Sequence, residues 1–569
     1  MNTTAGGSIP QDTASPSLPV SAFAAAGLGA AFHLASQNFE LDKHAWRLIG
    51  GFYLYVFSAI VAATYYLGNG VLSATLQVVP LAAATLVGLY SSIAIRRLFL
   101  SPLRKFPGPW QAHLSKFYHW YLESKNLQLF EEVRKMHEKY GDFVRTGPRE
   151  ISILRPSAIP LIYGGKSPCQ KGPWYDQTKF GDDGNSLFNI IDIKKHNHRR
   201  RIYDRGFSTK ALNSYEPRVQ DKVSTLIERL GSFEQKPVNV TAWMGYFSFD
   251  VMGDVIYSKE YNMMRDGNGK IAAGGVETTL SKLHDGMKML GLVGTTPWIL
   301  RMVSQMGDFG DFAIMQQWCR GAMKEKMAAW EPGTTPTDTA SYLIKDFIDD
   351  HATTQQTPQS ILQDSPLLII AGSDTTTSAA VNALYYLTKY PAVYARLQSI
   401  LDATFASAAD VTHDKAREIR LLDDIANETM RLKPPACEGL VRETPAEGLT
   451  VDGVFIPGKT IVSVPTWTIQ RDGRYWEDPE EWRPERWEGV NPNEEGLAFL
   501  PFSKGIFSCP GKTLAYMELR LLISRIALTF DIALAPGEDG VEFDTHPLDT
   551  FTMLNQPLQM VFKPRKQRA

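Results

Sequence analysis

The sequence predicts a mainly α-helical protein with small β-sheets, placed behind an N-terminal transmembrane helical anchor. Three observations indicate this class: an uncharged stretch at residues 48–95, apolar residues at helical spacing after Cys509, and only short strand-like segments, such as 143–145 and 150–154. The chain has 569 residues, 44% of them hydrophobic and 21% charged, which are values typical of a large globular protein. Its formal net charge of -2 gives no basic field, so no nucleic acid is expected as a partner.

Residues 1–100 contain the predicted membrane anchor. No Asp, Glu, Lys, Arg or His occurs in residues 48–95, and Gly68-Asn69-Gly70 divides this stretch into two spans at 48–67 and 71–95. Each span is long enough to cross a hydrocarbon core of roughly 30 Å. Because the Gly-Asn-Gly break falls between them, the two spans are predicted to form a helical hairpin.

A weaker apolar stretch at residues 18–39 is a candidate third span or interfacial helix. Basic residues follow the second strong span, and the positive-inside rule therefore places the rest of the chain in the cytosol. These residues are Arg96, Arg97, Arg104 and Lys105. A cleaved signal peptide is disfavoured because the chain has no basic start and its strong apolar run begins too late.

Residues 101–110 are predicted to form a proline-rich, non-helical hinge, since prolines stand at positions 102, 107 and 109. We expect the catalytic domain to occupy residues 111–569. Four cysteines stand far apart without a CxxC pair, which argues against a disulfide framework and against a cysteine-rich zinc site. They are Cys169, Cys319, Cys437 and Cys509.

The most informative segment is residues 499–511, which place Cys509 at the end of a glycine-containing loop and just before a helical run. Backbone N–H groups at a helix N-terminus favour a thiolate, which is the form that binds a metal. Gly505 and Gly511 on either side of the sulfur let the backbone bend and come close to a flat ligand. The alternative is a buried structural cysteine.

A second candidate site lies in a long helix predicted to start near Thr357-Pro358. This helix contains Ala371-Gly372-Ser373-Asp374-Thr375. Glycine is unfavourable inside a helix, but it gives room for a flat cofactor, and a threonine hydroxyl that bonds back to a carbonyl opens the helix locally. The alternative is a polar helix face.

Three further segments carry charged side chains in suggestive positions. Glu428 and Arg431 share one helix face, and Arg486 follows in Pro-Glu-Arg-Trp. His196 and Arg200 are four residues apart in a basic helix, for which an exposed basic surface is the alternative.

Together these segments resemble the cytochrome P450 family. The loop is similar to Phe-x-x-Gly-x-Arg-x-Cys-x-Gly, with matches at Phe502, Gly505, Cys509 and Gly511, but Phe507 stands where the family has arginine. The helix is similar to the family's Ala-Gly-x-Asp-Thr element. The motifs occur in family order across nearly the whole chain, and several local phrasings resemble fungal members of secondary metabolism.

The resemblance implies a role for each matched residue. Cys509 would be the axial ligand of haem iron, with Phe502, Gly505 and Gly511 shaping its loop. Thr375 would bond iron-bound dioxygen and Asp374 would pass protons. His196, Arg200 and Arg442, the last in Gly-Leu-Val-Arg-Glu-Thr, would contact haem propionates. Glu428, Arg431 and Arg486 would form a buried structural network.

The resemblance also implies an activity, a cofactor and partners. We expect a haem-thiolate monooxygenase with haem b (iron protoporphyrin IX), in the endoplasmic reticulum membrane with its catalytic domain facing the cytosol. Electrons would come from NADPH through a separate flavoprotein, cytochrome P450 reductase, with cytochrome b5 as a second candidate donor, and Lys504 and Lys512 as candidate docking residues. The substrate would be a lipophilic small molecule such as a terpenoid, polyketide or alkaloid.

Other functions remain open at this stage. A reductase-independent isomerase of the same family is disfavoured by Asp374 and Thr375, because only dioxygen activation needs that proton delivery. A degenerate haem-binding membrane scaffold is suggested by Phe507. A transporter is excluded because the apolar spans are confined to the first hundred residues. The loops expected to line the substrate pocket are 167–187, 291–306, 367–371, 436–440 and 550–554.

Overall fold

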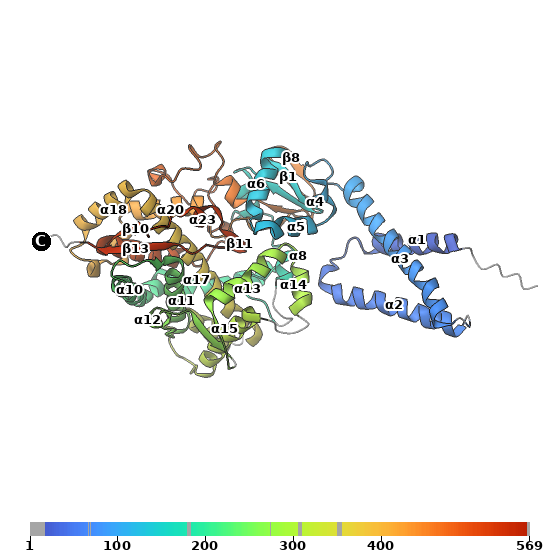
Figure 1. Ribbon diagram of the computed structural model, residues 1–569, viewed down its shortest axis with the longest axis horizontal. Helices are drawn as coiled ribbons and strands as arrows, with labels where there is room; N and C mark the ends of the chain where they lie inside the picture. The colour runs from blue at the N-terminus through green and yellow to red at the C-terminus, as the bar shows by residue number, and fades with distance from the viewer. Residues whose placement is uncertain are drawn as a thin grey trace, which may run out of the picture. The chain divides into compact units, whose positions relative to one another are not determined.

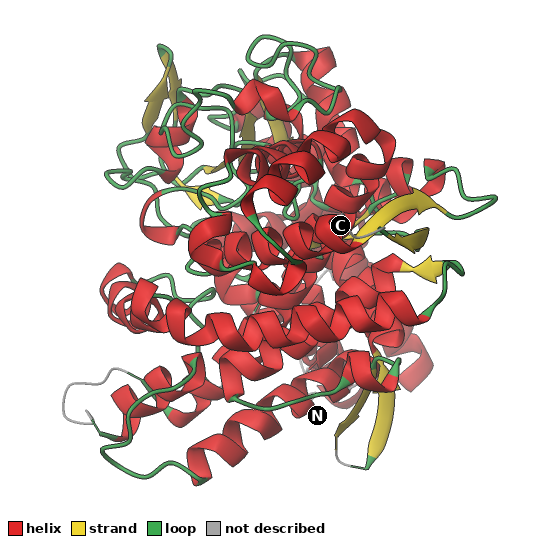
Figure 2. Ribbon diagram, turned by 90° about the vertical axis from the view of Figure 1, so that its left-hand side faces the viewer, coloured by secondary structure: helices red, strands yellow, loops and turns green. Residues whose placement is uncertain are grey.

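The computed structural model describes residues 18–66, 68, 70–178, 184–273, 275–304, 310–349 and 356–565. The chain divides into two compact units, Met1–Arg104 and Lys105–Ala569 (Figure 1). The boundary falls inside the proline-rich segment. The mainly helical class with small sheets, predicted from the sequence, is confirmed (Figure 2).

The N-terminal unit is built from three apolar helices. They are α1 (Leu18–Ser36), α2 (Ala45–Tyr66) and α3 (Val71–Ile95), with a 3₁₀ turn η1 (Asp42–His44) before α2 and a π-helical turn η2 (Arg96–Leu100) after α3. Ala45–Tyr66 and Val71–Leu100 are each long and apolar enough to cross a membrane. Helix α1 covers most of the weaker segment 18–39. Residue 67, the predicted end of the first span, and residue 69 lie outside the described residues.

Helix α1 packs directly against α3 through glycine. A Cβ added to Gly29 would lie 1.9 Å from the carbonyl oxygen of Thr85, and one added to Gly88 would lie 1.9 Å from that of Ala26. His33 Nδ1 also lies 2.8 Å from Ser92 Oγ. The two backbones therefore touch where neither residue has a side chain, which is a common way for membrane helices to associate.

The second unit, Lys105–Ala569, carries the segments that the sequence analysis assigned to a catalytic domain and is called the catalytic unit below. Its α-helices are α4 (Trp110–Leu114), α5 (Phe117–Asn126), α6 (Leu129–Tyr140), α7 (Ala158–Tyr163), α8 (Pro173–Gln177), α9 (Ile193–Gly206), α10 (Thr209–Ser232), α11 (Val240–Tyr257), α12 (Met263–Asp266), α13 (Leu280–Val293), α14 (Pro297–Ser304), α15 (Gly310–Ala328), α16 (Thr339–Ile348), α17 (Pro358–Lys389), α18 (Pro391–Thr404), α19 (His413–Ala416), α20 (Arg420–Leu432), α21 (Thr466–Ile469), α22 (Lys512–Thr529) and α23 (Val541–Thr545). Short 3₁₀ turns are η3 (Ala408–Asp410), η4 (Pro484–Trp487) and η5 (Gly505–Phe507).

The sheets are small and lie at the edges of the helical body. A four-stranded sheet has the order β1-β2-β9-β6, a three-stranded sheet has the order β10-β13-β3, and three hairpins pair β4 with β5, β7 with β8 and β11 with β12. The strands are β1 (Phe143–Gly147), β2 (Glu150–Ile153), β3 (Val238–Asn239), β4 (Lys270–Ala273), β5 (Val276–Thr279), β6 (Arg442–Glu443), β7 (Leu449–Val451), β8 (Val454–Ile456), β9 (Ile461–Ser463), β10 (Phe530–Leu534), β11 (Leu548–Thr550), β12 (Thr552–Leu554) and β13 (Gln559–Pro564). The two strands predicted near 143 and 150 pair antiparallel as β1 and β2.

Helix α17 runs through the centre of the catalytic unit. It begins at the predicted position, where Thr357 and Ser360 form a capping box and Pro358 occupies the first turn. Most residues of its C-terminal half are buried. The helix is held in place by α11, and this packing positions its central turn against the cavity described below.

The proline-rich segment is non-helical up to Trp110, and its second half is fixed to β1. Arg145 donates its backbone N–H to Pro107 O over 2.7 Å. A Cβ on Gly108 would lie 2.3 Å from the carbonyl oxygen of Arg145, so glycine is needed at this contact. Residues 107–110 therefore belong to the body of the catalytic unit.

Candidate active site

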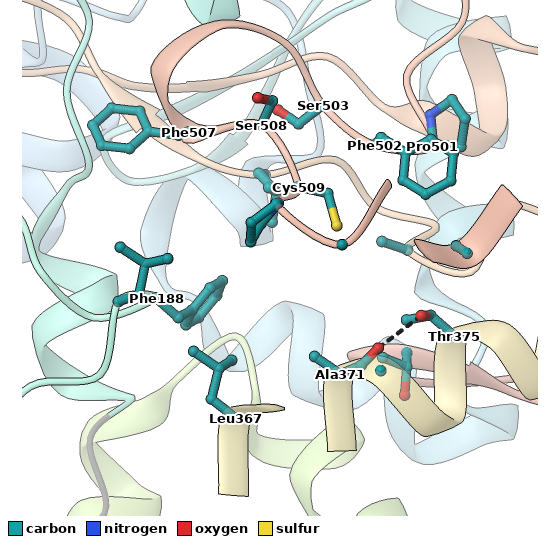
Figure 3. A pocket seen from close by; sticks show the side chains of 18 of the residues that line it. Phe188, Leu367, Ala371, Thr375, Pro501, Phe502, Ser503, Phe507, Ser508 and Cys509 are labelled. Carbon is teal, nitrogen blue, oxygen red and sulfur yellow. Dashed lines mark hydrogen bonds between the residues drawn. The ribbon is translucent and has the colours of Figure 1, made fainter. Parts of the chain in front are cut away.

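A cavity of about 290 Å³ lies between the cysteine loop and α17 (Figure 3). The Cys509 sulfur projects from the loop on one side, and Ala371 and Thr375 lie on the other. Aromatic and aliphatic side chains form most of its wall. They include Tyr163, Tyr175, Leu187, Phe188, Met252, Leu367, Leu368, Leu440, Leu500, Phe502, Leu514 and Phe551.

The cysteine loop is held in shape by its own backbone. Cys509 donates its N–H to Phe502 O over 2.9 Å, and Ser508 donates to Gly505 O over 3.0 Å. Gly505 has a φ of +64°, and a Cβ there would lie 2.3 Å from Tyr163 O. The glycine is therefore required for close contact with the end of α7. Gly511, which precedes α22, has only an ordinary contact with the Cys509 sulfur.

The Cys509 thiol has a pKa above its ordinary value. Burial within the protein body is the largest cause, although the sulfur itself is exposed to the cavity. The backbone N–H groups of Gly511 and Lys512 lower the pKa, as expected at a helix N-terminus, and so does the Arg200 guanidinium. The helix N-terminus therefore acts on the Cys509 pKa in the direction expected from the sequence, and desolvation acts against it.

The central turn of α17 has the predicted back-bond from a threonine hydroxyl to a carbonyl, within a continuous α-helix. Thr375 Oγ1 donates to Ala371 O over 2.7 Å (Figure 3). The place where a Gly372 Cβ would project is occupied by the thioether of Met252 on α11. Gly372 therefore gives room to a neighbouring helix in addition to lining the cavity.

Asp374 lies outside the cavity lining and contacts a histidine that the sequence motifs did not reveal. His284 Nε2 on α13 is 3.3 Å from Asp374 Oδ1. The carboxylate is buried, whereas the histidine is partly exposed, with a side-chain exposure of 24%. Asp374 Oδ2 has no hydrogen-bond partner within the described part of the chain. The pair joins the buried carboxylate to a group that reaches solvent.

Phe507 is surrounded by basic and aromatic side chains. Its ring centroid lies 4.6 Å from that of His196, in an edge-on arrangement. Lys171 Nζ is 4.8 Å and Arg442 Cζ is 4.9 Å from the same ring centroid. The residue that replaces the family's arginine is therefore a contact surface for two cations.

The predicted basic residues of the cavity have different partners. Arg442 is buried and donates from Nη1 to Tyr175 Oη over 2.6 Å, but its Nε and Nη2 have no partner among the described residues. Arg200 donates to the carbonyl oxygen of Ser508 and binds Asp204 over 2.7 Å. Burial lowers the pKa of His196 to about 3, so this histidine is neutral.

Comparison with known proteins adds independent evidence. The sequence model for "Cytochrome P450" matches residues 107–562. The chain is 36% identical to "Cytochrome P450 monooxygenase orf5" of Eupenicillium brefeldianum over 493 residues, which are 86% of this chain and 97% of that protein. The chain belongs to the cytochrome P450 family.

Two other P450 relatives extend the comparison. "Cytochrome P450 monooxygenase lcsK" of Purpureocillium lilacinum is 32% identical over 566 residues, covering 96% of this chain and 99% of that protein, so the match extends into the N-terminal unit. "Tryprostatin B 6-hydroxylase" of Aspergillus fumigatus is 32% identical over 474 residues, 81% of each chain. This P450 is a monooxygenase, and its relatives are monooxygenases of fungal secondary metabolism.

The cavity of this P450 fits the haem group that the family implies. A thiol faces the space, apolar side chains form most of its walls, and Arg442 offers two unpartnered buried donors suited to a carboxylate. Cys509 would hold the iron, and Arg442 and His196 would face propionate oxygens.

Glu428, Arg431 and Arg486 meet in a buried network away from the cavity. Arg431 donates to both carboxylate oxygens of Glu428 over 2.8 and 2.9 Å, and Arg486 Nε donates to Glu428 Oε1 over 2.8 Å. Trp487 Nε1 and the Arg483 N–H complete the shell, each at 2.9 Å. Every oxygen lone pair of this carboxylate therefore has a donor, which is the condition for burying an ion pair.

The loops expected to line the pocket are only partly those that do. Segments 167–187, 367–371, 436–440 and 550–554 each contribute lining residues. Segment 291–306 contributes no lining residue among its described residues, so the prediction for this segment was wrong. Residues 179–183, 305 and 306 lie outside the described residues. Glu518 on α22 was not expected, and burial raises the pKa of its carboxyl to about 8.

Lys504 and Lys512, the candidate docking residues, are only partly exposed to solvent. Lys504 Nζ donates to the carbonyl oxygen of Glu494 over 2.8 Å, and Lys512 Nζ contacts Asn493. Both side chains are half-buried against the loop before the cysteine segment. They stabilise that loop as well as placing positive charge beside it.

Proposed function

We propose that this P450 is a membrane-anchored haem-thiolate enzyme that hydroxylates a lipophilic small molecule, using electrons from NADPH delivered by a separate flavoprotein reductase. The observation that carries the proposal is the position of the Cys509 sulfur opposite Thr375 across an apolar cavity. The relatives' names support the reaction type, since they include a hydroxylase. A secondary metabolite such as a terpenoid, polyketide or alkaloid is the proposed substrate class.

Haem b, when bound through Cys509, supplies dioxygen activation and oxidation of a carbon–hydrogen bond. The other site residues bind, orient and move protons. Thr375 presents a hydroxyl at the central turn of α17, where it donates a hydrogen bond to Ala371 O at the cavity wall. Asp374, the preceding residue, is the proposed carrier of protons from His284 toward this hydroxyl, because its buried carboxylate contacts the partly exposed histidine.

Holding the cofactor is the proposed role of the polar residues at one end of the cavity. Neutral His196 and the free fork of Arg442 bind propionate oxygens. Arg200 fixes the cysteine loop through Ser508 O and adds positive charge there. Phe502 and Gly505 set the loop shape, since Phe502 accepts the Cys509 N–H and Gly505 packs against α7.

Membrane attachment and electron supply complete the proposal. Two apolar helices support an anchor in the endoplasmic reticulum membrane, with the catalytic unit on the cytosolic side. Cytochrome P450 reductase is the proposed donor, and cytochrome b5 is a second candidate. Positive charge from Lys504 and Lys512 beside the cysteine loop is suited to an acidic partner surface. Membrane lipid would deliver a lipophilic substrate to the apolar cavity.

The reduced, carbon-monoxide-bound difference spectrum of the full-length protein in membranes tests the haem-thiolate assignment. We expect a band near 450 nm, the family's signature, in the natural protein and its loss in Cys509→Ala. Persistence of the band in Cys509→Ala would remove the assignment of the ligand, and a folded natural protein without haem would favour the scaffold alternative.

Reconstitution with a reductase tests the oxygen chemistry. A panel of lipophilic compounds is first screened for a change in the haem spectrum, and each binder is then incubated with reductase and NADPH. Thr375→Ala should release more peroxide per NADPH than the natural protein, whereas Thr375→Ser, which keeps a hydroxyl, should not. Product formation without NADPH would instead support the reductase-independent isomerase.

A further inference from the structure

A buried lysine stands beside Phe507, the residue that departs from the family pattern. Lys171 lies in the loop before α8 and lines the cavity. Its side chain is buried, and Nζ donates to Leu187 O over 3.1 Å and Phe188 O over 2.8 Å. An ammonium has three donors, so two carbonyl contacts leave one N–H for another partner.

Lys171 and Arg442 share the Phe507 ring. Their cationic groups lie 4.8 and 4.9 Å from its centroid, so one aromatic ring accepts a cation–π contact from each. An arginine at position 507 would add a cation next to both. The Phe507 ring instead attracts the cationic groups of Lys171 and Arg442, which an arginine at this position would repel. Lys171 therefore provides a positive charge near the position where the family has its arginine.

Positive charge accumulates around this ring without a matching carboxylate. Neither Lys171 nor Arg442 makes an ion pair with an acidic side chain in the described part of the chain. Burial and the charges of Arg442 and Arg200 lower the pKa of Lys171 to about 6, so near pH 7 the amine carries its full positive charge only when an anion binds beside it. A buried cation pair of this kind is favourable when an anion neutralises it. The unpartnered Nε and Nη2 of Arg442 provide the side-on fork that a carboxylate prefers.

We propose that Lys171 replaces the arginine that the family carries at position 507: together with Arg442 it binds a propionate carboxylate of haem, and Phe507 supports both cations. This inference rests on the proposed function only in requiring that the protein bind haem. In this protein, Lys171 in the loop before α8 would contribute the haem affinity that an arginine in the cysteine motif contributes in other members of the family.

Comparison of haem with its dimethyl ester tests this assignment directly. The ester keeps the iron and the ring but lacks both carboxylates. Full-length protein freed of haem, in detergent, is titrated with each compound while protein fluorescence is measured. Lys171→Met should weaken haem binding by about ten- to hundredfold, the range expected for losing a charged hydrogen bond, and should leave ester binding unchanged.

The controls separate this role from a structural one. Lys166→Met, at an exposed lysine five residues earlier in the same segment, should change neither affinity. Lys171→Met combined with Phe507→Arg should regain most of the lost affinity for haem, because the charge returns at the family's usual position. Equal weakening of haem and ester in Lys171→Met, or unchanged haem binding, would overturn the proposal. Natural protein that binds neither compound and has no 450 nm band would overturn the proposed function itself.

Discussion

The imidazole of His284 on α13 lies 3.3 Å from the buried carboxylate of Asp374 on α17. This contact joins a residue of the oxygen-side helix motif to one that no sequence motif marked. The imidazole is the described side-chain partner of Asp374 Oδ1, whereas Oδ2 has no partner among the described residues. This contact helps to stabilise the buried carboxylate. In the proposed proton delivery, the first group therefore lies on α13 and not on α17.

Replacing His284 by leucine should uncouple electron consumption from product formation. Without the imidazole, Asp374 loses its described side-chain partner and its link to a partly exposed group, so proton transfer to the Thr375 hydroxyl slows. We expect several-fold more peroxide per NADPH, within the range of effects known for acid–base residues. The measurement is the ratio of peroxide to NADPH in the reductase-supported reaction, with the 450 nm band unchanged.

Two variants define what this result means. Lys282→Leu changes an exposed residue two positions away on the same helix and should leave coupling as it is. His284→Lys again places a proton donor beside Asp374 and should recover part of the coupling. A His284→Leu protein as tightly coupled as the natural one would show that Asp374 receives protons by another route.

Removing the carboxylate of Glu428 should strongly destabilise the catalytic unit. Glu428→Ala leaves Arg431 and Arg486 without their shared acceptor while Arg431 remains fully buried. Breaking a buried pair in this way costs about 3–5 kcal/mol. Thermal unfolding of the haem-loaded protein measures the loss. As a control, Glu485→Ala breaks an exposed pair with Arg396 and should cost about 1 kcal/mol or less of stability. Similar losses of stability in both variants would contradict a special role for the Glu428 network.

Much of the site could be predicted because its signals are local in the sequence. The Cys509 loop, the Thr375 back-bond and the start of α17 each depend on residues a few positions apart. The contacts of the Phe507 ring could not be predicted, since Lys171 and Arg442 belong to segments far from it in the sequence. The same holds for His284. Desolvation of Cys509 also depends on the complete fold, so the sequence could indicate the lowering of its pKa by the helix terminus but not the larger, opposite effect of burial.

The catalytic unit should become less stable as pH rises, because of a buried carboxylate cluster. Oxygens of Glu123 on α5, Glu438 and Asp549 on β11 lie within 4.8 Å of one another. Burial raises the pKa of all three, and the charge of Asp549 raises the pKa of Glu123 and Glu438 further. The folded protein therefore holds protons that the unfolded chain releases, so stability is greatest below about pH 4 for this cluster and falls as pH rises.

Glu123→Gln should reduce this pH dependence. The amide keeps the shape of the side chain and removes one titrating group, so the variant should be more stable than the natural protein at pH 8 and nearly equal at pH 5. A single proton changes stability by at most about 1.4 kcal/mol per pH unit. Melting temperatures across this range provide the measurement, with Glu138→Gln on α6 as an exposed control. A constant difference between variant and natural protein at every pH would exclude a titrating cluster.

Helix α1 should cross the membrane as a third span. Its contacts with α3 advance in the same direction along both helices, from Ala26 with Gly88 to His33 with Ser92, as in the first and third helices of an up-down-up bundle. With 19 residues, α1 is about 28 Å long, close to the thickness of the hydrocarbon core. An acceptor tag for N-glycosylation added before Met1 should then reach the lumen and be modified, whereas a tag after Ala569 should not. An unmodified N-terminal tag would mean two spans with α1 at the interface.

Two matched substitutions on α1 test whether its packing drives insertion. Gly29→Leu places a side chain where the Thr85 carbonyl oxygen lies, and it should lower the modified fraction by separating α1 from α3. Gly27→Leu adds the same hydrophobic surface at a position with nothing within 4 Å, so it should not lower the modified fraction. The two variants differ only in contact with α3. Equal modified fractions would therefore show that α1 inserts by hydrophobicity alone. A lower modified fraction in Gly29→Leu alone would show that the third span depends on packing against α3.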